Sequence, residues 1–359
     1  MTRQCRWMIS GMIAAAWLGL SGLTAAADGT VVVSSWGGSF QEAERKAIFD
    51  QFEQASGIKV IDDSGPSLLK IKTMVESGNV QWDVAEVNQG DYLALAEQGL
   101  LEEIDYSLLD EETRKQVPQT ALLKYGAEGV SYSRVIGWST KTFGDNGPQS
   151  WADVWDTKKF PGARVIDAGD YPNAPFEYAL LADGVTMDKM YPLDLDRSFA
   201  SLRKIRPDVV KWSTTSAMGP EALASGEADI AIVSSSRIEA LKRSGAPVNY
   251  TFNQGALIKD YLVVPKGAKN KADAMKLIAF YLKADGQARL AALQPLGPSN
   301  PAAFDHISDD IAHAIPTYPQ NAEKQILIDY AWWAKIEPKE NKTWREIAVA
   351  RWQQFLLEN

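Results

Sequence analysis

Short apolar runs rich in Val and Ile alternate along the chain with segments in which apolar residues recur at helical spacing. The runs predict strands and the periodic segments predict the helices that follow them. The predicted strands are 31–33, 58–61, 83–87, 164–167 and 229–233, and the predicted helices are 39–56, 68–76, 92–97, 176–182 and 238–243. Because strand and helix alternate, we expect an α/β fold with mainly parallel sheets covered by helices on both faces.

Two extended stretches suggest that the chain crosses between two domains. Residues 129–140 are extended and β-branched, and a second apolar strand at 261–264 follows Asp260. We place the start of a second domain near Trp138 and the return of the chain after Asp260. The expected division is one lobe of residues 28–137 and 262–359, and a second lobe of residues 138–261.

The first 27 residues have the pattern of a secretory signal peptide. Arg3 and Arg6 precede a mostly apolar stretch at 8–23, and three alanines at 25–27 offer a cleavage site. Ser and Gly residues interrupt the apolar stretch, which argues against a retained membrane span. We therefore expect a soluble, exported protein with Asp28 as its first residue.

Charge and cysteine content narrow the possible partners. The formal net charge of the chain is −9, whereas a nucleic-acid partner requires a basic face. The single cysteine, Cys5, lies in the predicted signal peptide. The mature protein is therefore expected to bind no nucleic acid and to depend on a large packed core instead of disulfides.

Residue types needed for common catalytic sites are scarce. The two histidines, His306 and His313, lie together away from the predicted strand ends. The chain has no G-x-S-x-G turn, no G-x-G-x-x-G loop and no phosphate-binding G-x-x-x-x-G-K-[ST] loop. We expect no metal, no cofactor and no enzyme activity, although carboxylate pairs leave an exported hydrolase as an alternative.

The turn after the predicted strand 229–233 is the strongest candidate for a binding site. Ser234 begins a polar turn that carries Arg237, and Asp260 stands just before the strand at 261–264. Ligands bind at the carboxyl ends of strands in open α/β sheets. A guanidinium can fork onto a carboxylate, and a carboxylate can accept an ammonium group, so this pair would hold a small zwitterion by its two ends. The alternative is that the two side chains pair with each other or with solvent.

Other strand ends supply further candidates for the same cleft. Trp36 lies in a strand-to-helix turn and is either a core residue or a ligand wall, and Trp212 is a second aromatic residue in a polar turn. Asn88 follows a strand and, like Ser234, offers a neutral hydrogen bond. Asp170 follows another strand and is either a cation acceptor or a turn residue.

The adjacent pair Trp332 and Trp333 is ambiguous, because neighbouring side chains on a helix point about 100° apart. We expect one to pack in the core and the other to reach the cleft, and we include Trp333 among the site candidates.

The mature chain resembles the periplasmic solute-binding proteins of bacterial ABC importers, in the spermidine/putrescine-type branch and close to γ-aminobutyrate binders. The resemblance rests on stretches that occur in the family's order, among them SWGGSFQEA, SWADVWDTKKFPG, LASGEADIAI, YLVVPKGAKNKADAMKLIAFYL, PLGPSNPAAF and DYAWWA. It implies a two-lobed, type II-like clamp in which each lobe is a mainly parallel sheet flanked by helices. It also implies a monomer that binds a small solute and delivers it to a membrane permease.

The resemblance also implies roles for several residues. Asp260 matches the aspartate that takes a ligand amine, and Trp36 matches an aromatic residue that stacks on the ligand. Arg237 corresponds to the arginine that γ-aminobutyrate binders use for the ligand carboxylate, while Ser234 begins a serine turn that replaces an aromatic wall. We therefore expect an amino-acid-like zwitterion such as γ-aminobutyrate.

The alternative ligand is a polyamine held by Asp260, Asp170 and Asp91. A ferric-ion receptor is less favoured because no adjacent tyrosine pair is present.

Overall fold

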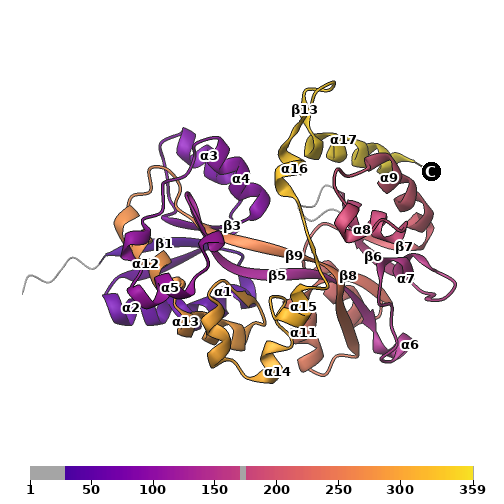
Figure 1. The fold of residues 1–359 in the computed structure, drawn as a ribbon, viewed down its shortest axis with the longest axis horizontal. Coiled ribbons are helices and arrows are strands. Elements are labelled where there is room, and N and C mark those ends of the chain that lie inside the picture. The colour runs from indigo at the N-terminus through magenta and orange to yellow at the C-terminus, as the bar shows by residue number, and fades with distance from the viewer. Residues whose placement is uncertain (1–28, 170–174, 359) are drawn as a thin grey trace, which may run out of the picture.

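The computed structural model describes residues 29–169 and 175–358, which form two lobes joined by a pair of long strands (Figure 1). The lobe at the left of Figure 1 contains the indigo and purple N-terminal elements, and the lobe at the right contains the magenta and rose elements from the middle of the chain. The predicted signal peptide and Asp170 lie outside the described residues.

Within the described residues, eleven strands form one sheet that continues through both lobes. The main path of the sheet is β2 (Lys59–Ser64), β1 (Thr30–Ser35), β3 (Val84–Asn88), β9 (Val248–Val263), β5 (Gly126–Ser139), β8 (Ile230–Ser234), β6 (Arg164–Asp167) and β7 (Val209–Ser213). The outer strands of each lobe are parallel, whereas β9 and β5 run antiparallel to their neighbours on this path. The predicted α/β class is confirmed, and the antiparallel centre results from the two crossing strands.

The remaining elements cover the faces and edges of the sheet. Short strands are β4 (Leu122–Leu123), β10 (Gly297–Pro298), β11 (Ile326–Leu327), β12 (Ile336–Glu337) and β13 (Lys342–Thr343). Helices up to the second crossing are α1 (Gly38–Glu44), the π-helix η1 (Arg45–Phe49), α2 (Asp50–Ser56), α3 (Leu68–Glu76), α4 (Gln89–Glu97), η2 (Tyr106–Leu108), α5 (Glu111–Gln116), η3 (Gln119–Ala121), α6 (Thr140–Phe143), α7 (Trp151–Trp155), α8 (Phe176–Ala182), η4 (Met187–Lys189), α9 (Leu195–Ile205), η5 (Arg206–Asp208), α10 (Met218–Ser225) and α11 (Ser235–Arg243). After it come α12 (Lys271–Tyr281), α13 (Ala284–Leu293), η6 (Pro301–His306), α14 (Asp309–Ala312), α15 (Pro319–Ala322), α16 (Tyr330–Ala334) and α17 (Trp344–Leu357). No helix in the described part of the chain has both the length and the apolar character needed to cross a membrane.

Each lobe has its own hydrophobic core. The first lobe packs β1, β3 and the end of β9 against the helices α1–α2, α12 and α13, with Phe49 and Tyr281 among its fully buried side chains. The second lobe packs β6 and β8 against α7, α8 and α9, around Trp151 and Phe176. In both cores, apolar residues of the strands pack against the apolar faces of the helices, as the sequence pattern predicts.

The C-terminal segment packs differently from the sequence-based division into lobes. That division assigned all of residues 262–359 to the first lobe, but Trp352 and Phe355 of α17 belong to the core of the second lobe, where they contact Phe199 and Trp212. The yellow helices α16 and α17 accordingly lie beside α8 and α9 in Figure 1. Aromatic side chains on α17 cover an apolar surface of the second lobe, and sequence periodicity cannot say which surface a helix will cover.

Candidate functional site

A cavity of about 220 Å³ lies between the two lobes and is lined by residues from both. Five of the eight sequence-predicted site residues meet here: Trp36, Asn88, Ser234, Arg237 and Asp260. The cavity also contains residues that the sequence analysis did not select: Ser39, Phe40, Val130, Tyr132, Ser216, Ser236, Gln294 and Leu296. The volume is below the roughly 300 Å³ at which pockets for drug-sized ligands begin, so it suits a small solute.

Asp260 provides a buried negative group at this cavity. Its side chain is 5% exposed, and Oδ1 has no hydrogen-bond partner among the described residues. Burial raises the pKa of Asp260 to about 7; a hydrogen bond from the Trp36 side chain opposes this, and the charges of Glu44 and Asp91 add to it. A buried carboxylate oxygen without a partner is costly, and an ammonium group would satisfy it.

Arg237 provides the positive group, on the first turn of α11 in the opposite lobe. Its side chain is exposed and has no hydrogen-bond or ion-pair partner among the described residues, Asp260 included. The N-cap residue of this helix, Ser234, makes no side-chain capping bond, and its Oγ lies 3.2 Å from Ser236 Oγ. Free backbone N–H groups at a helix N-terminus favour an anion. Arg237 and the start of α11 can therefore bind a carboxylate together.

Trp36 and Asn88 form the wall on the side of the first lobe. Gly37 and Gly38 have φ values of 71° and 59°, which other residues rarely adopt, and they turn the chain sharply after β1 so that Trp36 faces the cavity. Trp36 is 37% exposed, as a side chain that awaits a ligand would be. Asn88 Oδ1 accepts from the backbone N–H of Asp91 at 3.0 Å, which caps α4, so its amide group is what remains for a ligand.

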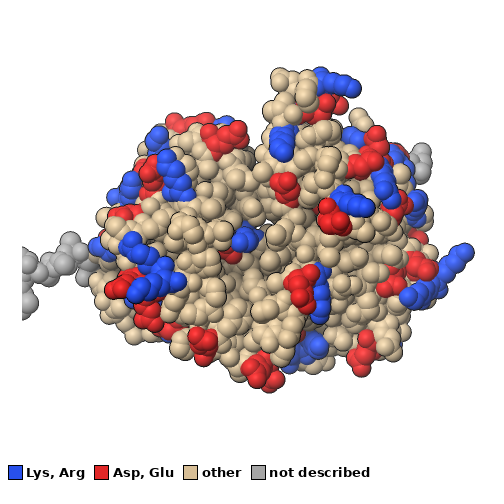
Figure 2. Space-filling model, viewed as in Figure 1, with Lys and Arg blue, Asp and Glu red and all other residues tan. Residues whose placement is uncertain are grey.

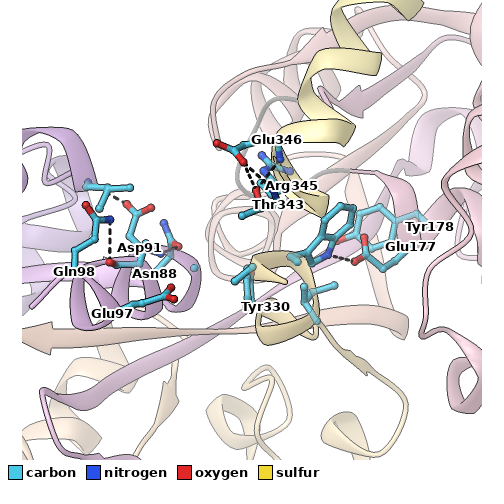
Figure 3. A pocket seen from close by; sticks show the side chains of 16 residues that line it. Asn88, Asp91, Glu97, Gln98, Glu177, Tyr178, Tyr330, Thr343, Arg345 and Glu346 are labelled. Atoms are coloured by element: carbon cyan, nitrogen blue, oxygen red, sulfur yellow. Dashed lines mark hydrogen bonds between the residues drawn. The ribbon is translucent and has the colours of Figure 1, made fainter. Parts of the chain in front are cut away.

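A second cavity, of about 440 Å³, lies on the same inter-lobe cleft and shares Asn88 with the first. Figure 3 shows Asn88, Asp91 and Glu97 on one wall and Glu177, Tyr330 and Arg345 on the other. Trp333 lines this second cavity, and its Nε1 donates to Glu177 Oε1 at 2.8 Å. Trp332 instead packs against Tyr191 and stacks on Trp344. Both tryptophans belong to the core of the second lobe, and of the two only Trp333 also lines the second cavity.

One predicted site residue in the described part of the chain, Trp212, does not line either cavity. Trp212 packs edge-on against Trp352 and Phe355, at ring-centroid distances of 4.9 and 5.6 Å, and lines neither cavity. Asp170 lies outside the described residues. Trp212 follows a strand as the other candidates do, but a helix distant in sequence covers it, which strand-end position alone cannot reveal.

Charged side chains of both signs are interspersed over the face shown in Figure 2, and the surface is hollowed between the lobes. Two lobes joined by crossing strands, with an acidic side chain on one wall of the cavity between them and a cation on the other, define a binding protein for small solutes. Residues 47–321 match the bacterial extracellular solute-binding proteins, and the chain belongs to this family. It is a substrate-binding protein of the ABC transporter type.

Similar proteins share most of the chain. The γ-aminobutyric acid-binding protein of Pseudomonas aeruginosa is 31% identical over 310 residues, covering 85% of this chain and 86% of the relative. The spermidine/putrescine-binding periplasmic protein of Escherichia coli is 24% identical over 315 residues, covering 84% of this chain and 86% of the relative.

Solved structures agree with this assignment. A substrate-binding protein of an ABC transporter from Bradyrhizobium japonicum has a TM-score of 0.83 at 38% identity, covering 91% of this chain and 99% of its own. The γ-aminobutyrate receptor Atu4243 has a TM-score of 0.79 at 38% identity, covering 91% of this chain and 97% of its own.

Proposed function

We propose that this protein captures a small amino acid with separated charges, γ-aminobutyrate or a close analogue, between its lobes. Asp260 takes the ammonium group, Arg237 and the start of α11 take the carboxylate, and Trp36 covers the aliphatic middle. Asn88 and Ser234 add neutral hydrogen bonds. Trp333, in the adjoining cavity, is a further candidate, and Asp170, outside the described residues, is a candidate from the sequence alone. The proposed role is binding without catalysis.

One observation carries this proposal: Asp260 and Arg237 line one cavity, and among the described residues neither Asp260 Oδ1 nor the Arg237 side chain has a partner. A zwitterion supplies a counter-charge to both at once. Two relatives whose names include γ-aminobutyrate point to the same ligand class.

A polyamine is the second candidate, because a relative binds spermidine and putrescine and because Asp91 and Glu177 line the adjoining cavity. Arg237 opposes this candidate, since its charge repels a second amine at the far end of the first cavity. The zwitterion is therefore favoured.

The proposed setting is the periplasm, after removal of residues 1–27. There the protein acts as a monomer and delivers its ligand to the membrane permease of an ABC importer.

Calorimetry with four related probes tests the ligand class. γ-Aminobutyrate carries both charges, butyrate and butylamine carry one each, and putrescine carries two amines. We expect γ-aminobutyrate to bind most tightly, with each single-charge probe weaker by tenfold or more, because a buried charge without its partner is costly. Tighter binding of putrescine than of γ-aminobutyrate would reject the zwitterion, and turnover of any amide or glycoside would revive an exported hydrolase.

A further inference from the structure

Behind the amine side of the cavity lies a buried pair of carboxyl groups, Glu44 and Glu86, that ligand contact does not explain. Both side chains are essentially inaccessible to solvent, at 0% and 1% exposed. Glu44 ends α1 and Glu86 lies in β3, so the two approach each other from different elements. Buried carboxyl groups without a cation nearby are unusual, and their hydrogen bonds indicate their protonation.

The hydroxyl of Ser35 touches both carboxyl groups. Ser35 Oγ lies 2.5 Å from Glu44 Oε2 and 2.8 Å from Glu86 Oε2, while Tyr281 OH donates to Glu44 Oε1 at 2.8 Å. A hydroxyl has one proton to donate, and an ionised carboxylate only accepts. One of the two carboxyl groups must therefore supply the second proton. Glu44 also accepts from Tyr281, and a carboxyl group with an additional donor is favoured in its ionised form. We therefore assign the negative charge to Glu44 and the proton to Glu86.

This pair is connected to the amine site through the chain and through the sheet. Ser35 directly precedes Trp36, whose side chain donates to Asp260. In the antiparallel ladder of β3 and β9, Asn88 lies opposite Asp260, and Glu86 is two residues before Asn88. Side chains two residues apart, and those directly across a ladder, share a face of the sheet. Glu86, Asn88 and Asp260 therefore lie on one face.

We infer that Glu44 is ionised and Glu86 holds a proton, so that this buried pair adds one negative charge to the amine site besides that of Asp260. This charge sets the pH range over which the site binds an ammonium group. This inference rests on the proposed function. Glu44 and Glu86 act through Asp260 and do not touch the ligand, so they are positioning residues.

The surrounding charges agree with this assignment. Burial raises the pKa of Glu44, and burial followed by the Glu44 charge raises that of Glu86 well above its usual value. The Glu44 charge also raises the pKa of Asp260. Of the other groups near Glu44, Tyr281 is a neutral donor, and Asp62 on β2 is bonded to Arg45 at 2.9 Å.

Further groups face Asp260 from other elements. The charge of Asp91 on α4 raises the pKa of Asp260. Burial and the charges of Glu177 and Asp260 raise the pKa of Tyr330 on α16. Glu44 differs from Asp91 in being fully buried, and it is the first of the two charges that raise the pKa of Asp260.

The consequence is that ligand binding is coupled to the loss of a proton from Asp260. An ammonium group binds the ionised form of Asp260, so affinity rises with pH until Asp260 has lost its proton. A negative charge at Glu44 moves this midpoint upward and raises the affinity plateau above it, because it attracts the proton and the ammonium group alike.

Calorimetry with γ-aminobutyrate from pH 5.5 to 8.5 tests this inference on the wild type, Glu44→Gln, Glu86→Gln, the double Gln variant and Glu42→Gln. Glu42 is an exposed carboxylate on the same helix and serves as the matched control. In the double variant we expect the midpoint to fall by about one pH unit and the plateau affinity to fall about three- to tenfold. Each single variant keeps one negative charge and shifts the midpoint by less than half as much.

A ligand-free measurement separates this inference from the proposed function. At pH 8 the infrared spectrum of the wild type should contain a protonated-carboxyl band that is missing from folded Glu86→Gln and from the double variant. A double variant whose pH profile matches Glu42→Gln overturns the inference, as does an unchanged infrared band. If the wild type binds neither γ-aminobutyrate nor putrescine, the proposed function fails, and loss of the band still supports the shared proton. Melting temperatures confirm that each variant is folded.

Discussion

Asp260 on β9 lies directly opposite Asn88 on β3, and the two side chains share one face of the sheet at the floor of the cleft. Their oxygens are used differently. Asn88 Oδ1 caps α4 and is committed to the fold, whereas Asp260 Oδ1 has no partner among the described residues. The fold thus holds the first side chain in place and leaves the second one available to a ligand.

Asp260 makes the unliganded protein less stable as pH rises, because its folded pKa of about 7 is above the usual value of about 3.9. The folded state keeps a proton that the unfolded state releases, so the free energy of unfolding falls from about pH 4 to about pH 7. We expect Asp260→Asn to be more stable than wild type at pH 8 by about 1–3 kcal/mol and equally stable at pH 4. Urea unfolding at both pH values measures this. The same variant should lose tenfold or more in γ-aminobutyrate affinity; a variant that is less stable at pH 8 would contradict the assignment.

Replacement of Arg237 by Ala should remove carboxylate binding without harming the fold, because the side chain is exposed and has no partner among the described residues. The expected loss is about 2–5 kcal/mol of γ-aminobutyrate binding, measured by calorimetry. Butylamine affinity should not fall, because this probe has no carboxylate. Arg243→Ala on the same helix is the control: Arg243 pairs with Glu239 at 2.7 Å and lines neither inter-lobe cavity. Equal losses in the two variants would show that helix charge alone matters.

Trp36→Phe separates the two roles of the indole ring. The phenyl ring keeps an aromatic wall but lacks the N–H that bonds to Asp260. Since that bond lowers the pKa of Asp260, its loss should move the midpoint of γ-aminobutyrate affinity to higher pH. The expected loss is about threefold at pH 7 and smaller at pH 8.5. An equal loss at every pH would mean that the ring acts only as a wall.

Trp212→Ala should affect stability and leave ligand affinity nearly as it is. The half-buried ring packs edge-on against Trp352 and Phe355, so its loss opens a gap beneath the C-terminal helix. We expect a decrease of about 2–4 kcal/mol in the free energy of unfolding. γ-Aminobutyrate affinity of the folded variant, measured by calorimetry, should stay within about threefold. A large loss of γ-aminobutyrate affinity with an unchanged free energy of unfolding would contradict this prediction and indicate that Trp212 contacts the ligand.

The buried ion pair between Arg134 and Asp167 fixes β5 to β6 in the second lobe. Both guanidinium nitrogens that bond to Asp167 are buried, and burial still raises the pKa of Asp167 to about 6. Arg134→Met leaves a buried carboxylate alone, so we expect a loss of about 3–5 kcal/mol in unfolding experiments at pH 7.5. Addition of Asp167→Asn should restore part of it. No recovery in the double variant would mean that the packing of Arg134 matters more than its charge.

The sequence predicted the part of the site that depends on strand ends. Trp36 follows β1, Asn88 and Ser234 end β3 and β8, and Arg237 lies on the helix after β8, whereas Asp260 lies inside the long antiparallel strand β9. Local patterns and the assumption of a sheet are enough to bring the first four residues to one cavity, and their role in ligand binding stays a prediction.

The sequence could not predict what depends on contacts between distant segments. The packing of α17 on the second lobe and the position of Trp212 beneath it both depend on which apolar surfaces meet. The Glu44 and Glu86 pair was also missed, although one signal existed. Glu86 is a charged residue inside an otherwise apolar strand, and such a residue requires a buried partner.

The two strands that cross between the lobes are not uniform. Pairing of β5 with β9 shifts register between Glu128 and Val130 and again between Arg134 and Ile136. Such irregularities bend a strand and loosen its ladder locally. The two irregularities lie at either end of the stretch where the chain passes from one lobe to the other, so the connecting ladder is regular in its middle and irregular at both ends. If the angle between the lobes changes, we expect the change to be concentrated at these two irregularities.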